Sequence, residues 1–258
     1  MKKLYPFIFK RKSIRKYKGP VKDEQLEEVS NFLDSLEPLI NSIETEFKIV
    51  STDDVKTFIQ RPTPQYIAAF SEKGRIAGTN IGFMLQQMDL RLSSMGIGSC
   101  WQGIPKPKSH ISSELEFIIL LAFGEPAEPL YRKHAEFKRK PLHEITDIKD
   151  MDEILEAVRL APSAANNQPW YFTREKNIIH AYQKIPNILK AGFIGKWNPV
   201  DMGIALAHLK ISLEHHGYKP KFKIYENPPK LKKHEYLGSM KIHPVNRASK
   251  KAQNWGKL

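Results

Sequence analysis

Hydrophobic residues recur at helical spacing in four stretches of the chain. They predict helices over 24–36, 82–95, 154–160 and 203–217. Asp23 is the expected N-cap of the first helix, because a short polar side chain can accept a hydrogen bond from the first turn. Gly96 is expected just past the end of the second helix, where glycine takes the left-handed conformation easily.

Short apolar runs predict strands between these helices. The candidates are 47–50, 66–70, 117–123 and a hairpin of 170–173 with 178–182, joined through 174–177. The run at 117–123 is apolar throughout, as expected of a central strand. The chain is therefore expected to combine helices and strands.

Two blocks of sequence repeat in the same order. Phe9-Lys-Arg-Lys12 recurs letter for letter as Phe137-Lys-Arg-Lys140, and the block 82–96 matches 203–217 without a gap. Two ordered matches favour an internal duplication over chance similarity. The expected units are residues 1–136 and 137–258, two halves packed intimately against each other.

The composition is that of an ordinary globular chain. Its 258 residues contain 41% hydrophobic and 27% charged side chains. No apolar run approaches the roughly 20 residues that cross a bilayer, and the amino terminus has no signal-peptide pattern. The single Cys100 excludes a disulfide within the chain. These features lead us to expect a cytoplasmic protein with no membrane segment.

The net charge of +13 leaves a nucleic-acid partner open as an alternative. The basic residues are spread along the chain, with one concentration at 10–18 and another in the tail from Arg247. No helix-turn-helix, zinc spacing or aromatic RNA-binding segment accompanies them. We therefore expect a surface that attracts phosphorylated cofactors or merely keeps the protein soluble, and nucleic-acid binding remains the less favoured interpretation.

Three side chains near the amino terminus are candidates for anion binding. Arg11, Ser13 and Arg15 alternate in sequence, so an extended backbone would point all three the same way. Guanidinium groups are permanently charged and bind oxyanions with a planar fork. An exposed basic segment without a ligand is the alternative explanation of this pattern.

A second candidate is the small-residue loop Ala161-Pro-Ser-Ala-Ala-Asn-Asn-Gln-Pro-Trp170. Pro162 interrupts the preceding helix, and the loop then offers short hydrogen-bonding side chains. Such a loop suits contact with a planar polar ligand. A third candidate is Gly96-Ile-Gly-Ser-Cys-Trp-Gln-Gly103, whose glycines permit close backbone approach.

These three segments together resemble the FMN-dependent nitroreductase family. The pattern Arg-x-Ser-x-Arg-x-Tyr at 11–17 is similar to the family's opening, and Pro-Ser-x-x-Asn-x-Gln-Pro-Trp at 162–170 is similar to its flavin-facing loop. The resemblance implies a nitroreductase-like α+β fold with bound FMN. The cofactor-binding residues that it implies are Arg11, Lys12, Ser13, Arg15, Cys100, Trp101, Gln102, Gly103, Arg139, Pro162, Ser163 and Asn166.

The resemblance also implies a ping-pong reaction. Reduced nicotinamide, NADH or NADPH, would deliver hydride to the flavin, which would then reduce a nitro or quinone-type acceptor. Another flavin reaction on the same fold, such as reductive dehalogenation, is the alternative. No protein acid or base is predicted: Cys100 has no partner in any motif and is expected to be a small buried residue beside the cofactor. The nine histidines have no metal-ligand spacing, so no metal is expected.

The family motifs are distributed unevenly between the two halves. The first half contains the arginine motif and Cys100, whereas the second contains the loop with Ser163 and has Pro141 and His143 where Ser13 and Arg15 would be repeated. We therefore expect one composite site, one FMN per chain and a monomer that reproduces the family's dimer internally.

Overall fold

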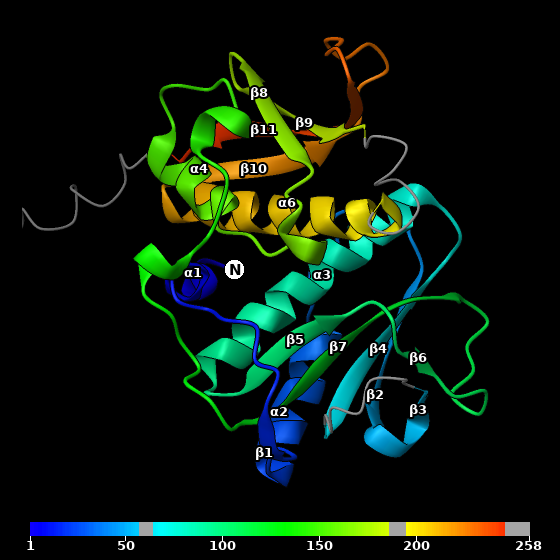
Figure 1. The fold of residues 1–258 in the computed structure, drawn as a ribbon. Coiled ribbons are helices and arrows are strands. Elements are labelled where there is room, and N and C mark those ends of the chain that lie inside the picture. Colours follow the sequence, from blue (N-terminus) through cyan, green and yellow to red (C-terminus); the bar gives the residue numbers. More distant parts are fainter. Residues whose placement is uncertain (57–63, 186–194, 246–258) are drawn as a thin grey trace, which may run out of the picture.

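A computed structural model describes residues 1–56, 64–185 and 195–245. The basic tail from Arg247 lies outside the described residues. The helices are α1 (Tyr5–Ile8), α2 (Asp23–Asp34), α3 (Arg75–Ser94), α4 (Asp152–Arg159) and α6 (Asn198–His215). The long helices α3 and α6 lie against each other at the centre of the molecule, between two sheets (Figure 1).

The first sheet is built from the first half of the chain. Its strands are β1 (Tyr17–Gly19), β2 (Thr45–Ser51), β4 (Gln65–Ser71), β5 (Gly98–Gln102) and β7 (Glu116–Pro126). The central strand β7 pairs antiparallel with β4 and β5 and, at its end, with β1, and β2 forms the edge beyond β4. A short ladder joins β3 (Val55–Lys56) to β6 (Lys106–Pro107).

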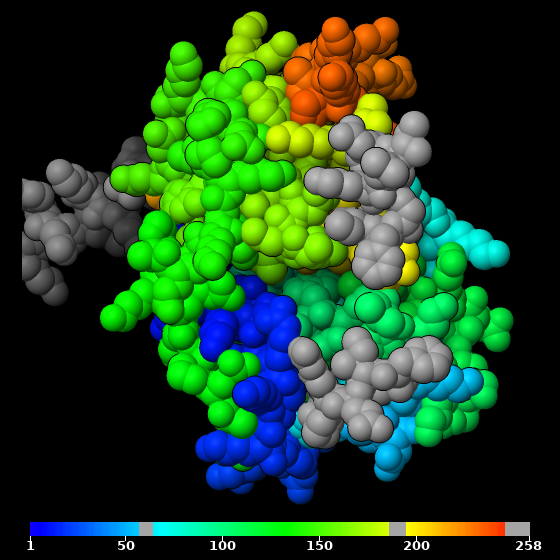
Figure 2. Space-filling model, in the orientation of Figure 1, coloured from blue at the N-terminus to red at the C-terminus, as the bar shows by residue number. Residues whose placement is uncertain are grey.

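The second sheet follows the same plan with strands from the second half. Its strands are β8 (Trp170–Glu175), β9 (Ile178–Lys184), β10 (Tyr218–Lys223) and β11 (His234–Pro244). All three pairings are antiparallel, in the order β10-β11-β9-β8, which has the same form as β5-β7-β4-β2 in the first sheet. Figure 2 shows the first half of the chain below the second half on one face of the molecule.

One hydrophobic core joins both halves. It contains buried residues of both sheets and both central helices, among them Phe83, Leu121, Trp170 and Leu206. The helices α3 and α6 are buried on nearly every side, including polar residues such as Asn80. The two halves therefore share their core, and neither half has its central helix facing solvent. None of the described helices is long and apolar enough to cross a membrane.

Several predicted boundaries are wrong, among them the start of α6, which is Asn198 and not Gly203. Helix α3 begins at Arg75, seven residues before Gly82, because a helix buried on all sides has no amphipathic period to mark its start. Lys22 is the N-cap of α2, and Asp23 is the first helical residue. The first hairpin strand continues to Glu175 and the second begins at Ile178, so the turn between them has two residues. The first of these, Lys176, has a φ of 53°. Gly96 takes the expected positive φ of 82°.

Candidate functional site

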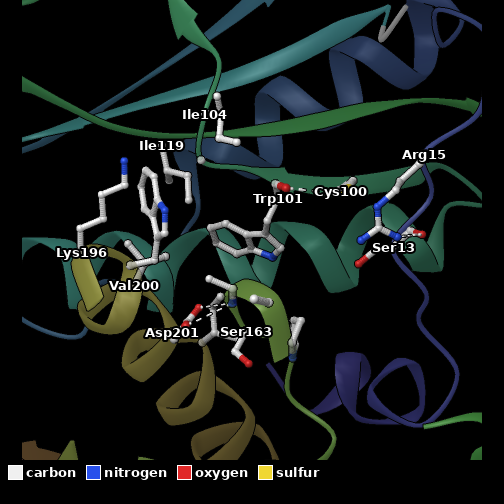
Figure 3. Close-up of a pocket in the computed structure, with 16 residues that line it drawn as sticks. Ser13, Arg15, Cys100, Trp101, Ile104, Ile119, Ser163, Lys196, Val200 and Asp201 are labelled. Carbon is white, nitrogen blue, oxygen red and sulfur yellow. Dashed lines mark hydrogen bonds between the residues drawn. The ribbon is translucent and has the colours of Figure 1, made fainter. Parts of the chain in front are cut away.

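A cavity of about 250 Å³ lies where segments of both halves meet. Strand β5 and the amino-terminal segment contribute from the first half, and the loop after α4 and the start of α6 contribute from the second. Figure 3 shows Trp101 at the centre, with Ser13 and Arg15 at one end and Lys196 at the other. Seven predicted cofactor-binding residues line this cavity: Ser13, Arg15, Cys100, Trp101, Gly103, Pro162 and Ser163.

The amino-terminal segment is held beside β5 by backbone contacts. The amide of Ile14 donates a hydrogen bond to the Ser99 carbonyl oxygen at 2.8 Å, and Ser13 forms a parallel bridge with Ser99. The amide of Arg15 donates to Glu128 Oε1 at 2.9 Å. Arg15 itself remains exposed, so its permanent positive charge is available at the cavity wall.

The loop after α4 is fixed by its own hydrogen bonds and by an unusual backbone. The Gln168 amide donates to Ser163 Oγ at 2.9 Å, and Gln168 Oε1 accepts from the Lys140 amide at 3.0 Å. Ala165, Asn166 and Gln168 have φ values of 48°, 56° and 48°. Non-glycine residues in this region cost free energy, and such residues cluster at functional sites. The strained backbone of this loop therefore supports a functional role for the cavity wall.

Asp201, in the first turn of α6, holds this loop in place by a hydrogen bond. Its Oδ1 and Oδ2 accept a shared hydrogen bond from the Ala164 amide at 3.0 and 3.1 Å (Figure 3). Burial raises the pKa of the Asp201 carboxyl to about 8, against the weaker lowering effect of that hydrogen bond. At neutral pH the cavity wall therefore contains a protonated carboxyl group.

Two tryptophans and a glycine shape the wall. A Cβ on Gly103 would lie 2.6 Å from the ring of Trp197, so only glycine fits there. Trp101 presents an indole Nε1 that is buried and has no hydrogen-bond partner among residues 1–56, 64–185 and 195–245. A buried N–H donor without a partner is costly unless a bound molecule satisfies it. Trp101 Nε1 is therefore a candidate ligand-binding atom.

Arg11 does not line the cavity, contrary to the expectation that its side chain would point the same way as that of Arg15. Its guanidinium is 1% exposed, and Nε pairs with Asp89 Oδ2 at 2.9 Å. Nη2 also donates to Ser13 Oγ at 3.1 Å, which connects Arg11 to the cavity wall. The burial of Asp89, which is fully enclosed, accounts for this orientation, because an enclosed carboxylate requires a cation.

Arg11, Arg132 and Arg139 form an arginine cluster behind Ser13. Burial first, and then repulsion by Arg11, Arg132 and Arg159, lower the pKa of Arg139 to about 10. The pKa of Arg132 is lowered by burial first and by Arg11 second. Arg11 Nη1 and Arg132 Nε are buried and have no hydrogen-bond partner among the described residues. Mutually repelling cations with unpaired N–H groups form a site that an anion would stabilise.

Five of the predicted site residues do not line the cavity: Arg11 and the four described next, Lys12, Gln102, Arg139 and Asn166. Lys12 points away and pairs with Glu128 at 3.0 Å, as alternation along an extended segment requires. Gln102 lies in β5 opposite Leu120. Arg139 Nη1 donates to Asn166 Oδ1 at 2.7 Å, so these two residues contact each other in the second layer of the wall. Arg139 also donates from Nε to the Ala161 carbonyl oxygen at 3.1 Å, near the end of α4.

Several residues of this site were not predicted from the sequence. They are Arg132, Lys196, Trp197, Val200, Asp201 and Ile204. Trp197 is the N-cap of α6 and Asp201 lies in its first turn, and both precede Gly203, where the repeated block begins. The repeat therefore marked the helix without its first turn. Among the described residues there is no group of His, Cys, Asp and Glu that could hold a metal ion.

The similarity to known proteins covers most of the chain. Residues 3–213 match the family model described as "Putative TM nitroreductase". The crystal structure of a "putative nitroreductase" from Thermotoga maritima is 21% identical, with a TM-score of 0.67 over 93% of this chain and 94% of that chain. That likeness shows the fold.

A "putative nitroreductase" from Desulfovibrio desulfuricans, solved in complex with FMN, is 18% identical, with a TM-score of 0.41 over 55% of this chain and 93% of that chain. A search of curated protein sequences gave no match.

Proposed function

The chain belongs to the nitroreductase family, whose model spans residues 3–213, and from this premise we propose that it is an FMN-dependent oxidoreductase. The proposed reaction is the reduction of a nitro or quinone-type acceptor with NADH or NADPH as the electron donor. The observation that carries the proposal is the arginine cluster beside a cavity whose walls combine aromatic rings with unpaired polar groups.

The residues present fit the phosphate of FMN. Arg11 Nη1 and Arg132 Nε are buried donors without partners in the described part of the chain, and burial together with the neighbouring positive charges lowers the pKa of Arg139. A phosphate dianion would accept from the unpaired donors and relieve the repulsion between the guanidinium groups. Ser13, which already accepts a hydrogen bond from Arg11, connects this cluster to the cavity. We assign the cluster as the phosphate-binding part of the site.

The cavity walls fit a planar polar ring. Trp101 Nε1 is a buried donor without a partner, and Gly103 leaves room for the Trp197 ring. Cys100 is 4% exposed and lines the same wall, which agrees with a small packing residue. The exposed guanidinium of Arg15 can stabilise negative charge on a bound ring. We assign Ser13, Arg15, Cys100, Trp101, Gly103, Pro162 and Ser163 to cofactor binding.

Bound FMN supplies the redox chemistry, because it can accept two electrons from a reduced nicotinamide and release them to a second substrate. The chain positions the cofactor and controls the polarity around it. Asp201 holds a proton on its carboxyl group at neutral pH, and Trp101 offers an N–H donor to the same cavity. The loop of Ser163, held in a strained conformation, keeps one wall rigid.

We further propose that the chain is an internal duplication in which residues 1–136 and 137–258 reproduce a dimer. The equal strand order of the two sheets and the paired helices α3 and α6 support this. Among the described residues, Arg15 and Gly103 line only the first of the two equivalent cavities, and Ile224 stands at the position of Gly103 in the second. The proposed minimal unit is therefore a monomer with one FMN.

The absorption spectrum of the purified protein tests this function. We expect a yellow protein, or a colourless one that becomes yellow on addition of FMN. Anaerobic mixing with NADH and with NADPH should then bleach the flavin, and a quinone or nitroaromatic compound should restore the colour. A protein that cannot be loaded with FMN, or a bound flavin that neither nicotinamide reduces, would contradict the proposal.

A further inference from the structure

A second cavity, of about 650 Å³, lies between α3, the loop after α2 and the strands β10 and β11. Its lining corresponds to that of the first cavity at a constant spacing in sequence. The residue pairs separated by 121 positions are Trp101 and Phe222, Gly103 and Ile224, Ile119 and Met240, and, with the halves exchanged, Phe83 and Ile204. The second cavity is therefore the structural counterpart of the first.

The wall formed by the loop after α2 is anchored in the same way as the wall of the first cavity. Asn80 Oδ1 accepts hydrogen bonds from the amides of Leu39 and Ile40 at 2.8 and 3.1 Å. Asp201, which anchors the loop of Ala164, follows Asn80 by 121 residues. The second cavity thus has a built wall, fixed by a buried side chain, and is more than a gap between surface loops.

The chemistry of the second cavity differs from that of the first. Lys221 stands where Cys100 stands in the first cavity, and Ile224 fills the position of Gly103. No arginine is among the residues that line it. A flavin would lose both the close approach that glycine allows and the guanidinium groups that suit its phosphate. The second cavity is therefore suited to a different ligand.

The lining combines an apolar floor with a cationic mouth. Phe83, Phe222 and Met240 are apolar, and the loop adds Pro38 and Leu39. Lys221 and Lys223 are exposed at the mouth. In the described part of the chain neither of these two lysines pairs with a carboxylate within 4.0 Å, in contrast to Lys210, which pairs with Glu37 at 2.6 Å. Two uncompensated positive charges therefore stand beside an apolar pocket.

We propose that this second cavity binds a small organic carboxylate with an aromatic or aliphatic body. The apolar body would pack on Phe222 and Met240, and the carboxylate would pair with Lys221 and Lys223. The volume of about 650 Å³ lies within the range of ordinary small-molecule pockets. This site is independent of the proposed flavin site, since the two linings share no residue.

Methyl NMR of the FMN-saturated protein labelled with ¹³C at the methionine methyl groups tests this proposal. The probe is 4-phenylbutyrate, and its uncharged match is 4-phenylbutanamide. The resonance of Met240, assigned with Met240→Leu, should shift saturably with the carboxylate and at least tenfold more weakly with the amide. The other six methionines serve as internal controls. The flavin-free protein should give the same affinity, so a failure of the proposed function does not affect the result.

The matched variants are Lys221→Glu with Lys223→Glu, and Lys219→Glu as the control on the same strand. Lys219 is exposed like the other two but does not line the cavity. The double variant should weaken binding at least tenfold, and the control should change it less than twofold. No saturable shift of Met240, equal affinity for the amide, or equal loss in the control would overturn the proposal. Tighter binding of phenyl phosphate than of the carboxylate would overturn the assigned ligand class.

Discussion

Gly82 of α3 packs against the backbone of α6, and Gly203 of α6 packs in the equivalent way against the backbone of α3, where the two central helices cross. A Cβ on Gly82 would lie 2.1 Å from the Val200 carbonyl oxygen, and a Cβ on Gly203 would lie 2.0 Å from the Thr79 carbonyl oxygen. Val200 follows Thr79 by 121 residues, as Gly203 follows Gly82. The helices therefore cross with approximate two-fold symmetry, and each contact leaves room only for a hydrogen atom.

The first prediction is that Gly82→Ala and Gly203→Ala each destabilise the protein by similar amounts. An added methyl group must push the backbones apart, and overpacking of this kind costs about 1–3 kcal/mol or more. Gly78→Ala, on the same helix, is the control, because its Cβ would lie 3.2 Å from a Pro199 side-chain atom. Urea denaturation measures all three. A loss of stability for one of the two crossing glycines alone would contradict the symmetric crossing.

The second prediction separates phosphate binding from ring binding. Arg132→Ala should weaken FMN binding about ten- to hundredfold, because a charge-assisted hydrogen bond contributes about 1.5–3 kcal/mol. Its affinity for riboflavin, which lacks the phosphate, should be unchanged. Arg174→Ala, which removes an exposed pair with Asp150, is the control. If Arg132→Ala weakened both flavins equally, the arginine cluster would not be the phosphate site.

The third prediction concerns Arg11, whose loss should affect the fold as well as the cofactor. Arg11→Ala would leave the enclosed Asp89 without its cation, and breaking a buried pair in this way costs about 3–5 kcal/mol. Weaker FMN binding should accompany the lower melting temperature. His143→Ala should change neither quantity, because His143 lines neither of the two cavities. An Arg11→Ala protein as stable as the wild type would show that Asp89 does not need this partner.

The fourth prediction concerns the pH dependence of stability. His208 Nδ1 donates to the Ala157 carbonyl oxygen at 2.8 Å, and its Nε2 accepts from Gln86 at 3.1 Å. Burial lowers the pKa of His208 from 6.5 to about 3. Between these values the unfolded chain binds a proton that the folded chain excludes, so stability should fall as the pH drops below about 6.5.

Thermal unfolding from pH 7 to pH 5 measures the slope of that loss. A His208→Gln variant keeps a buried polar side chain without a titrating group, and its stability should fall less steeply over the same interval. His243→Gln, at an exposed position near the end of β11, should retain the wild-type slope. Equal slopes for wild type and His208→Gln would contradict the excluded proton.

The sequence predicted the family, the types of most elements and seven of the cavity-lining residues, because local patterns and family motifs carry that information. It did not predict that Arg11 turns inward, since its partner Asp89 lies in another element and was not marked by any motif. The start of α3 was missed because burial on all sides removes the polar face that marks a helix.

Contacts between segments far apart in the chain were also beyond the sequence patterns. Trp197 packs against Gly103, and Asp201 holds Ala164, although these residues are far apart along the chain or belong to no motif. The sequence indicated a second position, equivalent to the flavin site but without the flavin motifs, and did not predict a cavity there. That two lysines and an apolar floor meet there depends on how β10, α3 and the loop after α2 pack together.

The stoichiometry of FMN binding tests the central claim most directly. Flavin-free protein of known concentration is titrated with FMN, and the quenching of flavin fluorescence is followed to saturation while the molar mass is measured by light scattering. We predict one FMN per chain bound to a monomer of 29.7 kDa, because among the described residues Arg15 and Gly103 line only the first of the two equivalent cavities. Saturation at two FMN per chain, or binding by a dimer alone, would contradict the single composite site.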